Sequence, residues 1–321
     1  MDADEEMVGV VVPMYNSERT IAATMASICA QTHRRLDIVV TDDGSTDGSA
    51  ALVEGWCRRD PRVRLVRQSN AGVAAARNAG AAATPARFLA FVDADDIWAP
   101  TKIEYQLAAL REGGASAGLA YCWYASIDQR DRVVSFGPQP LIEGQVVRDL
   151  CNANWIGNGS SLLLRRDAFE RAGGYEPGLR ARRAQGAEDL LMCLRVAEIA
   201  EFRVVPRYLV GYRMLPDSMS TDSVQMFRST EIVLQEFLAK YPDYADELDR
   251  HLQDSRTWFA YRAGRSGRLS AALVLLREAF AVHPAGTAMY LARAAVAIAA
   301  GRVRRRIGRK VTYPLYTGVV W

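Results

Sequence analysis

Short apolar runs alternate with segments of helical periodicity in the first hundred residues. The predicted strands are Val8–Val12, Leu36–Thr41, Val63–Val66 and Arg87–Val92. The predicted helices between them follow Ser17, taken as an N-cap, and span Ala50–Arg59 and Val73–Ala83. Strands separated by helices of this length indicate βαβ units, and therefore an α/β fold with a mainly parallel sheet and helices on both faces.

The alternation becomes less regular beyond Thr101. Further strands are predicted at Leu119–Ser126, Arg132–Phe136, Ser160–Leu164 and Phe202–Val210, and helices at Ile103–Leu110 and Ala187–Ala197. From Asp222 onward the pattern is wholly helical, and Leu269–Val282 is clearly amphipathic. We therefore expect an α/β region at residues 1–220, followed by a helical C-terminal region at residues 221–321.

Polar residues gather where three of the predicted strands end. Pro13-Met14-Tyr15-Asn16 follows the first strand, Asp42-Asp43 the second and Asp93-Ala94-Asp95-Asp96 the fourth. Since ligands of open parallel sheets bind beyond the carboxyl ends of the strands, we expect the three clusters to meet at one edge. The crowded carboxylates of the third cluster repel one another, and a divalent cation would relieve that repulsion and hold a phosphate.

Six ordered segments resemble the motifs of a family 2 glycosyltransferase with a GT-A fold. They are Val11–Asn16, Val40–Asp47, Asn70–Asn78, Asp93–Asp96, Gly173-Gly174-Tyr175 and Glu188-Asp189. The resemblance covers residues 7–215 and implies an inverting transfer of a sugar from a UDP-sugar or dTDP-sugar to an acceptor hydroxyl. It further implies a role in bacterial-type cell-surface glycan or glycolipid synthesis.

The resemblance assigns the nucleotide to the first three motifs. It implies that the carboxylate of Asp43 accepts a hydrogen bond from the imide N–H of uracil or thymine, and that Arg77 stacks on or bonds the base. Pro13 and Tyr15 would wall the base pocket, with Asn16 beside them. The alternatives are turn chemistry for Asp43, a solvated helix position for Arg77 and simple packing for Tyr15.

The acidic motifs carry the chemistry that the resemblance implies. Asp93 would face the ribose, and Asp95 would coordinate Mg²⁺ or Mn²⁺ on the diphosphate. Asp96 would support the turn or cap the helix near Pro100. Asp189 would be the general base and Glu188 its neighbour that orients the acceptor. As an alternative, two acids at this place favour a helix N-terminus through its dipole.

Four further residues are weaker candidates. Asn158 and Gly159 would shape the donor-sugar or acceptor pocket, or form a flexible turn. Trp155 would stack on a sugar ring, or pack in the core. In relatives a basic residue near Arg213 approaches the diphosphate, which makes this arginine a candidate nucleotide ligand. The loop that follows it matches the family only loosely.

Composition excludes some classes. A net charge of +3 is too small for a whole-protein nucleic-acid footprint. The five cysteines lack CxxC pairing, which favours reduced thiols in the cytoplasm. The N-terminus does not resemble a signal peptide, and no apolar window is long enough for a membrane span. The three histidines, His33, His251 and His283, are isolated, and we interpret them as structural or surface residues.

The segment Arg302–Lys310 holds six positive charges in nine residues. We expect it to rest on an anionic membrane surface, which would suit a peripheral enzyme with a lipid-linked or glycan acceptor. A solvated charged tail is the alternative. Two other activities stay open: a catalytically silent nucleotide-sugar-binding module, and a Mg²⁺-dependent nucleotidyltransferase. The latter would need an early glycine-rich phosphate loop, which Met14–Thr20 does not supply.

Overall fold

The computed structural model describes residues 6–215 and 221–292. Within these residues nine strands form one sheet, in the order β3-β2-β1-β4-β8-β6-β9-β5, with β7 paired to β6. The strands are β1 (Val8–Met14), β2 (Leu36–Asp42), β3 (Val63–Arg67), β4 (Phe88–Phe91), β5 (Ile97–Trp98), β6 (Ala117–Ile127), β7 (Val133–Phe136), β8 (Leu162–Arg165) and β9 (Glu201–Arg213).

The helices alternate with these strands and then continue alone. Those of the sheet region are α1 (Ile21–Cys29), α2 (Ser49–Arg59), α3 (Val73–Ala82), α4 (Lys102–Glu112), α5 (Val147–Asn152), α6 (Arg166–Arg171), α7 (Gly178–Ala181) and α8 (Glu188–Ala197). Those that follow are α9 (Ser223–Lys240), α10 (Ala245–Arg265) and α11 (Leu269–Val282). Short 3₁₀ turns lie at Gly159–Ser161 and Pro242–Tyr244.

The sheet is parallel in one half and mixed in the other. β1, β2, β3 and β4 pair in parallel, as the βαβ pattern predicts. β8 runs antiparallel to both β4 and β6, and β5 antiparallel to β9, whereas β6 and β9 are parallel. The α/β class with helices on both faces is therefore confirmed, but the expectation of a mainly parallel sheet holds only for the N-terminal half.

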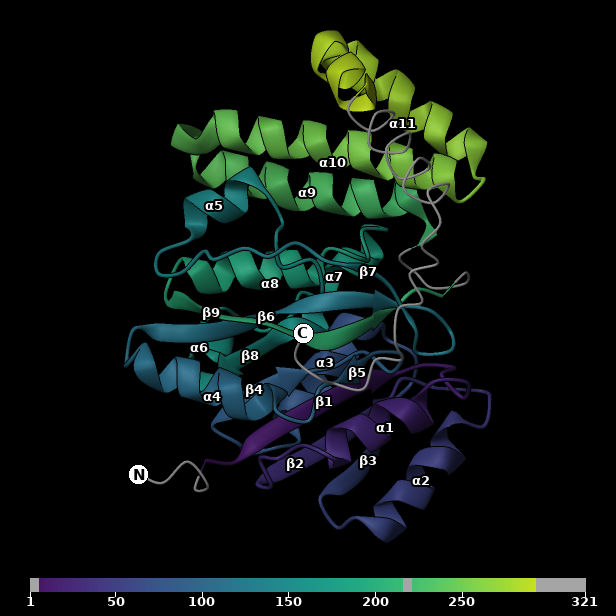
Figure 1. Ribbon diagram of the computed structural model, residues 1–321, viewed down its shortest axis with the longest axis vertical. Coiled ribbons are helices and arrows are strands. Elements are labelled where there is room, and N and C mark those ends of the chain that lie inside the picture. Colours follow the sequence, from purple (N-terminus) through teal and green to yellow (C-terminus); the bar gives the residue numbers. More distant parts are fainter. Residues whose placement is uncertain (1–5, 216–220, 293–321) are drawn as a thin grey trace, which may run out of the picture.

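Alternate residues of the central strands enter two separate cores. In β4, Leu89 and Phe91 pack with α3, α6 and α8, whereas Phe88 and Ala90 pack with α1 and α4. The same alternation recurs in β1, β6 and β8, so each central strand is buried on both faces. Figure 1 shows the two helical layers, with α8 above the sheet and α1 and α2 below it.

A proline lies inside β1 at no cost to the sheet. Val11 accepts a hydrogen bond from Val92 N–H on the β4 side, and Met14 accepts one from Asp43 N–H on the β2 side. Since alternate residues face alternate neighbours, Pro13 faces the β4 side, where pairing has already ended at Val11. Its missing N–H therefore leaves no ladder bond unmade, and β1 continues two residues past the predicted end.

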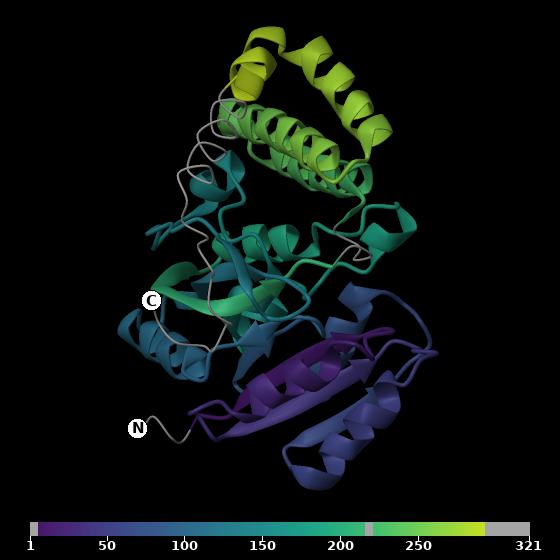
Figure 2. The same cartoon turned by 45° about the vertical axis from the view of Figure 1, so that its right-hand side comes forward.

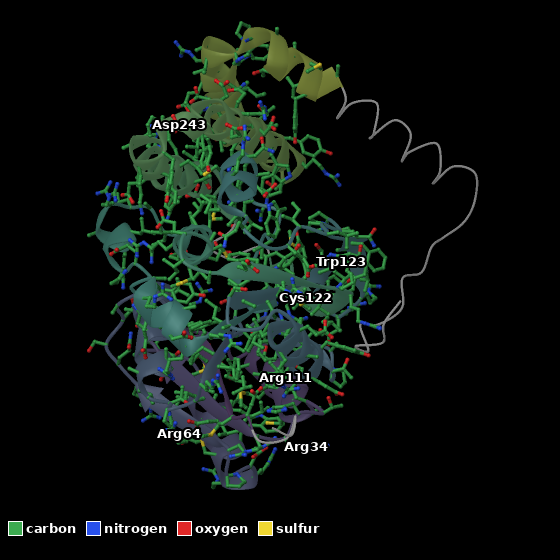
Figure 3. All side chains as sticks on the ribbon, turned by 90° about the vertical axis from the view of Figure 1, so that its left-hand side faces the viewer. Arg34, Arg64, Arg111, Cys122, Trp123 and Asp243 are labelled. Atoms are coloured by element: carbon green, nitrogen blue, oxygen red, sulfur yellow. The ribbon has the colours of Figure 1, made fainter. Side chains whose placement is uncertain are left out.

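The C-terminal helices stack on the outer side of α8. Val233, Leu234 and Phe237 of α9, with Leu248 of α10, belong to the same core as the side chains of α8. Figures 1 and 2 show α9 and α10 side by side, with α11 beyond them. In Figure 3 this region, marked by Asp243, lies at the end opposite β3, marked by Arg64. Among residues 6–215 and 221–292, no helix combines the length and apolarity that a membrane crossing needs.

Replacing either of two helical glycines by alanine should change stability, in opposite directions. A Cβ at Gly80 of α3 would overlap Val11 Cγ1 and lie 2.8 Å from Thr41 Oγ1, both buried in the sheet. At Gly55 of α2 a Cβ would meet only Arg58 Nη2, at an ordinary contact distance of 3.9 Å. Gly80→Ala should lower the free energy of unfolding by about 1–3 kcal/mol through overpacking. Gly55→Ala should raise it by about 0.5–1 kcal/mol, because alanine loses less backbone entropy. Urea denaturation measures both, and a stabilised Gly80→Ala would contradict the close approach.

Candidate active site

The sheet register brings the predicted polar clusters to one edge. Met14 at the end of β1 pairs with Asp42 at the end of β2. Asp43 N–H then donates to Met14 O at 2.8 Å, and Val92 N–H after β4 donates to Val11 O at 3.1 Å. The residues that follow β1, β2 and β4 therefore leave the sheet side by side, which confirms the convergence predicted from the strand pattern.

Asp43 organises the loop that leads into α3. Its buried carboxylate accepts hydrogen bonds from Gln68 Nε2 at 2.7 Å and from the backbone N–H groups of Ala71 and Gly72, each at 2.8 Å. Gly72 has φ +93°, a conformation that favours glycine. An ionised carboxylate offers about four acceptor positions, so about one remains for the predicted base contact.

The end of β1 is open to solvent at Tyr15 and tied down at Asn16. The Tyr15 side chain is 52% exposed, so its ring is available to a ligand. Asn16 adopts φ +48°, and its Oδ1 accepts a hydrogen bond from Thr46 N–H at 2.8 Å. Its own N–H donates to Ser45 Oγ at 3.0 Å. Asn16 thus joins the turns after β1 and β2, and Pro13 beneath them is buried.

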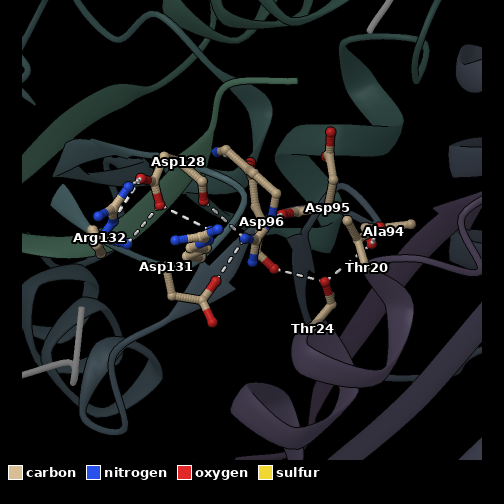
Figure 4. Close-up of polar contacts among 10 residues, drawn as sticks. Thr20, Thr24, Ala94, Asp95, Asp96, Asp128, Asp131 and Arg132 are labelled. Atoms are coloured by element: carbon tan, nitrogen blue, oxygen red, sulfur yellow. Dashed lines mark hydrogen bonds and ion pairs between the residues drawn. The ribbon is translucent and has the colours of Figure 1, made fainter. Parts of the chain in front are cut away.

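The turn Asp93–Asp96 is held by hydroxyl groups from two other elements. Thr20, just before α1, donates to Ala94 O at 2.9 Å, and Thr24 of α1 donates to Asp96 O at 2.8 Å. Asp93 N–H donates to Ser160 Oγ at 3.1 Å. Figure 4 shows these two threonines beside the turn. The acidic side chains therefore project from a fixed backbone.

Asp96 is a structural residue in this arrangement. Its carboxylate is fully buried and accepts hydrogen bonds from Ser160 Oγ at 2.5 Å and from Arg213 N–H at 2.9 Å. It supports the turn, which was one of its two expected roles. The other is wrong, because α4 begins at Lys102 with Thr101 at its N-cap.

Arg213 braces the same turn from β9. Its Nε donates to Asp95 O at 2.6 Å, and its Nη1 donates to Asp128 O at 3.1 Å and lies 2.5 Å from Asp131 Oδ1. The side chain is only 3% exposed. This arginine therefore lies at the acidic turn, and its contacts there are with the backbone and with Asp131. Its predicted contact with a diphosphate stays a prediction.

The Asp93–Asp95 pair fits a divalent cation chemically. Burial, together with the negative charge of Asp93, raises the pKa of Asp95 to about 7. A cation would relieve this repulsion. Among residues 6–215 and 221–292, no group of three or more His, Cys, Asp or Glu side chains is arranged as a metal site. Mg²⁺ is commonly held by one or two carboxylates together with substrate phosphates, and the pair matches that pattern.

Arg77 lies among the acidic residues rather than in solvent. Its Nη2 is 2.6 Å from Asp93 Oδ1, and its guanidinium stacks over the ring of Tyr175 at 4.9 Å. The Arg77 side chain is buried, so the solvated alternative is wrong. The expected contact with a base stays a prediction, since the guanidinium already pairs with the residue assigned to the ribose.

The third and fifth motifs are joined through Asn78. Its Nδ2 donates to Tyr175 O at 2.8 Å, and its Oδ1 accepts a hydrogen bond from Tyr175 N–H at 2.9 Å. The two preceding glycines, Gly173 and Gly174, have φ of +84° and +68° and turn the chain toward α3. This double contact places Tyr175 beneath Arg77.

Glu188 and Asp189 begin α8 and face Arg77. Glu188 Oε2 accepts a hydrogen bond from Gly186 N–H at 2.9 Å, and Asp189 Oδ1 accepts one from its neighbour Leu190 N–H at 2.8 Å. Burial raises the pKa of both carboxyls, and the positive charge of Arg77 opposes that rise. The two acids thus belong to the same charge cluster as Asp93, although they follow it by almost a hundred residues.

Gly159 lies against this cluster and Trp155 does not. A Cβ at Gly159 would be 3.2 Å from Arg77 Nη2 and 3.8 Å from Asp189 Cβ, so only a glycine leaves that space open. Asn158 is buried, and its Nδ2 has no hydrogen-bond partner among the described residues. Trp155 packs in the core, 4.8 Å from the ring of Tyr121, which corrects its assignment to a sugar-binding surface.

Some site residues escaped the sequence interpretation. Ser160 and Thr24 hold the acidic turn, and Tyr175 lies beneath Arg77. Their partners are distant in the sequence, so the local pattern around each residue does not reveal these contacts. For Ser160 the signal was its place beside Asn158-Gly159; for Tyr175 it was the motif that contains it. The five cysteines are all free, as expected. Arg302–Lys310 lies outside the described residues, so its predicted membrane contact stays a prediction.

Comparison with known proteins gives a consistent family match. The model for "Glycosyl transferase family 2" matches residues 9–173. An Escherichia coli protein, UDP-Glc:alpha-D-GlcNAc-diphosphoundecaprenol beta-1,3-glucosyltransferase WfgD, is 32% identical over 148 residues. The aligned stretch covers 46% of this chain and 57% of that relative, so the similarity spans little more than half of its length.

Solved structures share the fold at low sequence identity. Staphylococcus aureus TarS 1-349 in complex with UDP-GlcNAc superposes with a TM-score of 0.60 at 17% identity, covering 80% of this chain and 81% of that one. The mannosyltransferase PcManGT from Pyrobaculum calidifontis, in complex with GDP-Man and Mn²⁺, gives a TM-score of 0.58 at 21% identity, covering 92% and 81%. At sequence identities of 17% and 21%, these similarities show a shared fold and nothing further.

Asp43→Asn should destabilise the protein even without a ligand. The amide would present a donor to one of three N–H groups and leave it unpaired, at about 1–3 kcal/mol. Urea denaturation measures the change. Glu54→Gln, which removes only an exposed ion pair with Arg67, is the control and should shift the free energy by less than about 1 kcal/mol. Equal stability of Asp43→Asn and the wild type would contradict the role of Asp43 in the loop.

Proposed function

Because the chain belongs to glycosyl transferase family 2, we propose that it transfers a sugar from a nucleoside diphosphate donor to an acceptor hydroxyl with inversion at the anomeric carbon. The observation that carries the proposal is the charge cluster. Asp93, Arg77 and Asp189 come from the turn after β4, from α3 and from α8, and they meet at the carboxyl edge of the parallel half-sheet. Stability alone gives little reason to gather these acids there.

The donor nucleotide is proposed to lie along the ends of β1 and β2. Tyr15 offers an exposed ring on which a base could stack, and Asp43 retains about one acceptor position for an imide N–H. A uracil or thymine base would supply that N–H. UDP is our first choice, since a relative is named for UDP-Glc and a structural neighbour was solved with UDP-GlcNAc.

The diphosphate is proposed to lie over the Asp93–Asp96 turn. Asp95 would hold Mg²⁺ or Mn²⁺, with Asp93 beside it. The ion would supply positive charge to the departing diphosphate as the bond to the sugar breaks. Arg77 holds Asp93 in place through its ion pair, so the carboxylate keeps one orientation before the donor arrives. Arg213 and Thr20 keep the backbone of the turn rigid.

Asp189 is proposed to be the general base. Its carboxylate would take the proton of the acceptor hydroxyl while the oxygen attacks the anomeric carbon from the face opposite the diphosphate. Glu188 has one buried oxygen, Oε1, without a partner among the described residues, and it would accept a hydrogen bond from the acceptor. One displacement inverts the configuration and needs no covalent sugar–enzyme intermediate.

The acceptor is proposed to be a growing cell-surface glycan carried on a lipid diphosphate. The support is the relative named for a diphosphoundecaprenol acceptor. Free cysteines throughout the chain support a reducing compartment such as the cytoplasm. The basic segment Arg302–Lys310 would hold the enzyme at the inner membrane surface, where that acceptor lies.

Asp189→Asn should separate catalysis from binding. The amide cannot accept the hydroxyl proton, so kcat for transfer should fall by about 10²–10⁴-fold while UDP affinity is retained. Steady-state kinetics and calorimetry with UDP measure the two quantities. Because burial raises the pKa of Asp189, the acid limb of the wild-type rate should lie above the ordinary range of an aspartate.

The matched control is Asp167→Asn, which changes an exposed aspartate in the first turn of α6. It should leave transfer and UDP affinity unchanged. Full transfer by Asp189→Asn would remove this residue as the base. A wild-type protein that binds UDP-sugars but neither transfers nor hydrolyses them would instead be a silent binding module.

Nucleotide binding should depend on the metal through Asp95. Ligands that bind the folded state raise the melting temperature, so UDP should do so, and more with Mn²⁺ present. Asp95→Asn should remove the extra shift from Mn²⁺ and keep the shift from UDP alone. Thermal-shift measurements with UDP, dTDP and GDP check both the metal and the base. An Mn²⁺ increment that survives in Asp95→Asn would place the metal elsewhere.

A further inference from the structure

Two C-terminal helices each contact one of the two segments that flank Asp189. α9 contacts the loop before α8, and α10 contacts the end of α5 and the segment that follows it. From α9, Ser229 Oγ donates to Gln185 O at 2.7 Å, in the loop that leads to Glu188. In the same loop Gly186 has φ +115°, and a Cβ there would overlap Met226 Sδ of α9. The loop before α8 is therefore shaped directly by a C-terminal helix.

The other loop is held by α10. Glu247 Oε1 pairs with Arg148 of α5 at 2.6 Å, and Arg250 Nη1 donates to Asn152 Oδ1 at 2.7 Å. One turn after Glu247, His251 contacts Cys151 of α5 and Asn154 just beyond it, and the histidine is only 3% exposed. Because the Arg148 side chain is 69% exposed, its ion pair with Glu247 contributes little to this restraint. The contacts of Arg250 and His251 fasten the end of α5, from which the chain runs through Trp155 to Gly159.

Both ring nitrogens of His251 are used. Nε2 lies 3.1 Å from Asn154 N, and Nδ1 lies 3.3 Å from Cys151 O. A backbone N–H only donates and a carbonyl only accepts, so Nε2 must be the acceptor and Nδ1 must carry the proton. The ring is then neutral, in agreement with burial, which lowers the pKa of His251 to about 4.

Asn154 links His251 to the segment that leads to the active site. Its N–H is bound by His251, and its Oδ1 accepts a hydrogen bond from Gly157 N–H at 3.1 Å. Gly157, with φ +80°, precedes Asn158 and Gly159, which lies against Arg77 and Asp189. Two hydrogen bonds, followed by the backbone from Gly157 to Gly159, therefore connect α10 to the acidic cluster.

We propose that His251 is a positioning residue for the transfer reaction: by binding Asn154 it fixes where Asn158 and Gly159 lie against the general base. The inference rests on the proposed function for its catalytic consequence. The restraint on the segment itself does not depend on that function. The nucleotide contacts proposed at Tyr15 and Asp43 come from other elements, so UDP binding should not depend on His251.

The test compares His251→Phe, His251→Asn and Glu247→Gln. Phenylalanine fills the site without hydrogen bonds, whereas asparagine can keep the donor to Cys151 but not the acceptor for Asn154. Glu247→Gln removes an ion pair between the same two helices and leaves the ring contacts intact. The first readout is amide hydrogen exchange of a peptide covering residues 152–160, and the second is UDP affinity alongside transfer kinetics.

Both histidine variants should exchange about tenfold faster in residues 152–160, because local opening becomes easier. Transfer kcat should fall about tenfold in these variants, since a small displacement of reacting groups costs rate, with UDP affinity within about twofold of the wild type. Glu247→Gln should change none of the three. If His251→Phe does not fold, His251→Asn decides alone.

Unchanged exchange in the histidine variants would overturn the restraint. Faster exchange with full kcat would overturn the positioning role. A parallel loss of UDP binding and transfer would show general destabilisation, and would overturn it too. Failure of the proposed function is distinguishable, because the wild type itself would then show no transfer, whereas here only the variants lose it.

Discussion

The acidic site depends on one buried carboxylate that belongs to none of its proposed chemistry. The Asp96 carboxylate accepts hydrogen bonds from the Ser160 hydroxyl and from Arg213 N–H. It therefore links the turn after β4, the turn before β8 and the end of β9. Ser160 also accepts the N–H of Asp93. A buried carboxyl group costs free energy unless it is hydrogen-bonded, so these three segments must meet for the fold to be stable.

The positive charge of a single arginine offsets part of the negative charge of several carboxylates. Arg77 is buried, pairs with Asp93 and opposes the burial-driven rise in the pKa of Glu188 and Asp189. The pKa of Glu188 and Asp189 stays raised nonetheless, and the pKa of Asp95, farther along the turn, is raised to about 7. The members of the cluster therefore differ: Arg77 partly compensates the carboxylates near it, and Asp95 has the stronger chemical reason to bind a cation.

The strand ends could be predicted because a parallel βαβ pattern fixes which ends share an edge, as Met14 and Asp42 show. Contacts between distant segments could not. β5 has only two residues and exists through its pairing with β9, so no periodicity reveals it. From the sequence, Trp155 could equally stack on a sugar ring or pack in the core. Its contact with Tyr121, which decides between the two, appears only in the folded structure. His251 is isolated in sequence, and its two partners lie about a hundred residues away.

The matched family region ends at residue 173, before α8, α9 and α10 begin. The segments that lie against Asp189, the proposed base, are nevertheless held by those later helices through Ser229 and His251. If acceptor choice follows from how these loops are held, it can diverge by substitutions far from any catalytic carboxylate. Two enzymes with the same donor half would then build different glycans, and exchanging their C-terminal helices would exchange their products.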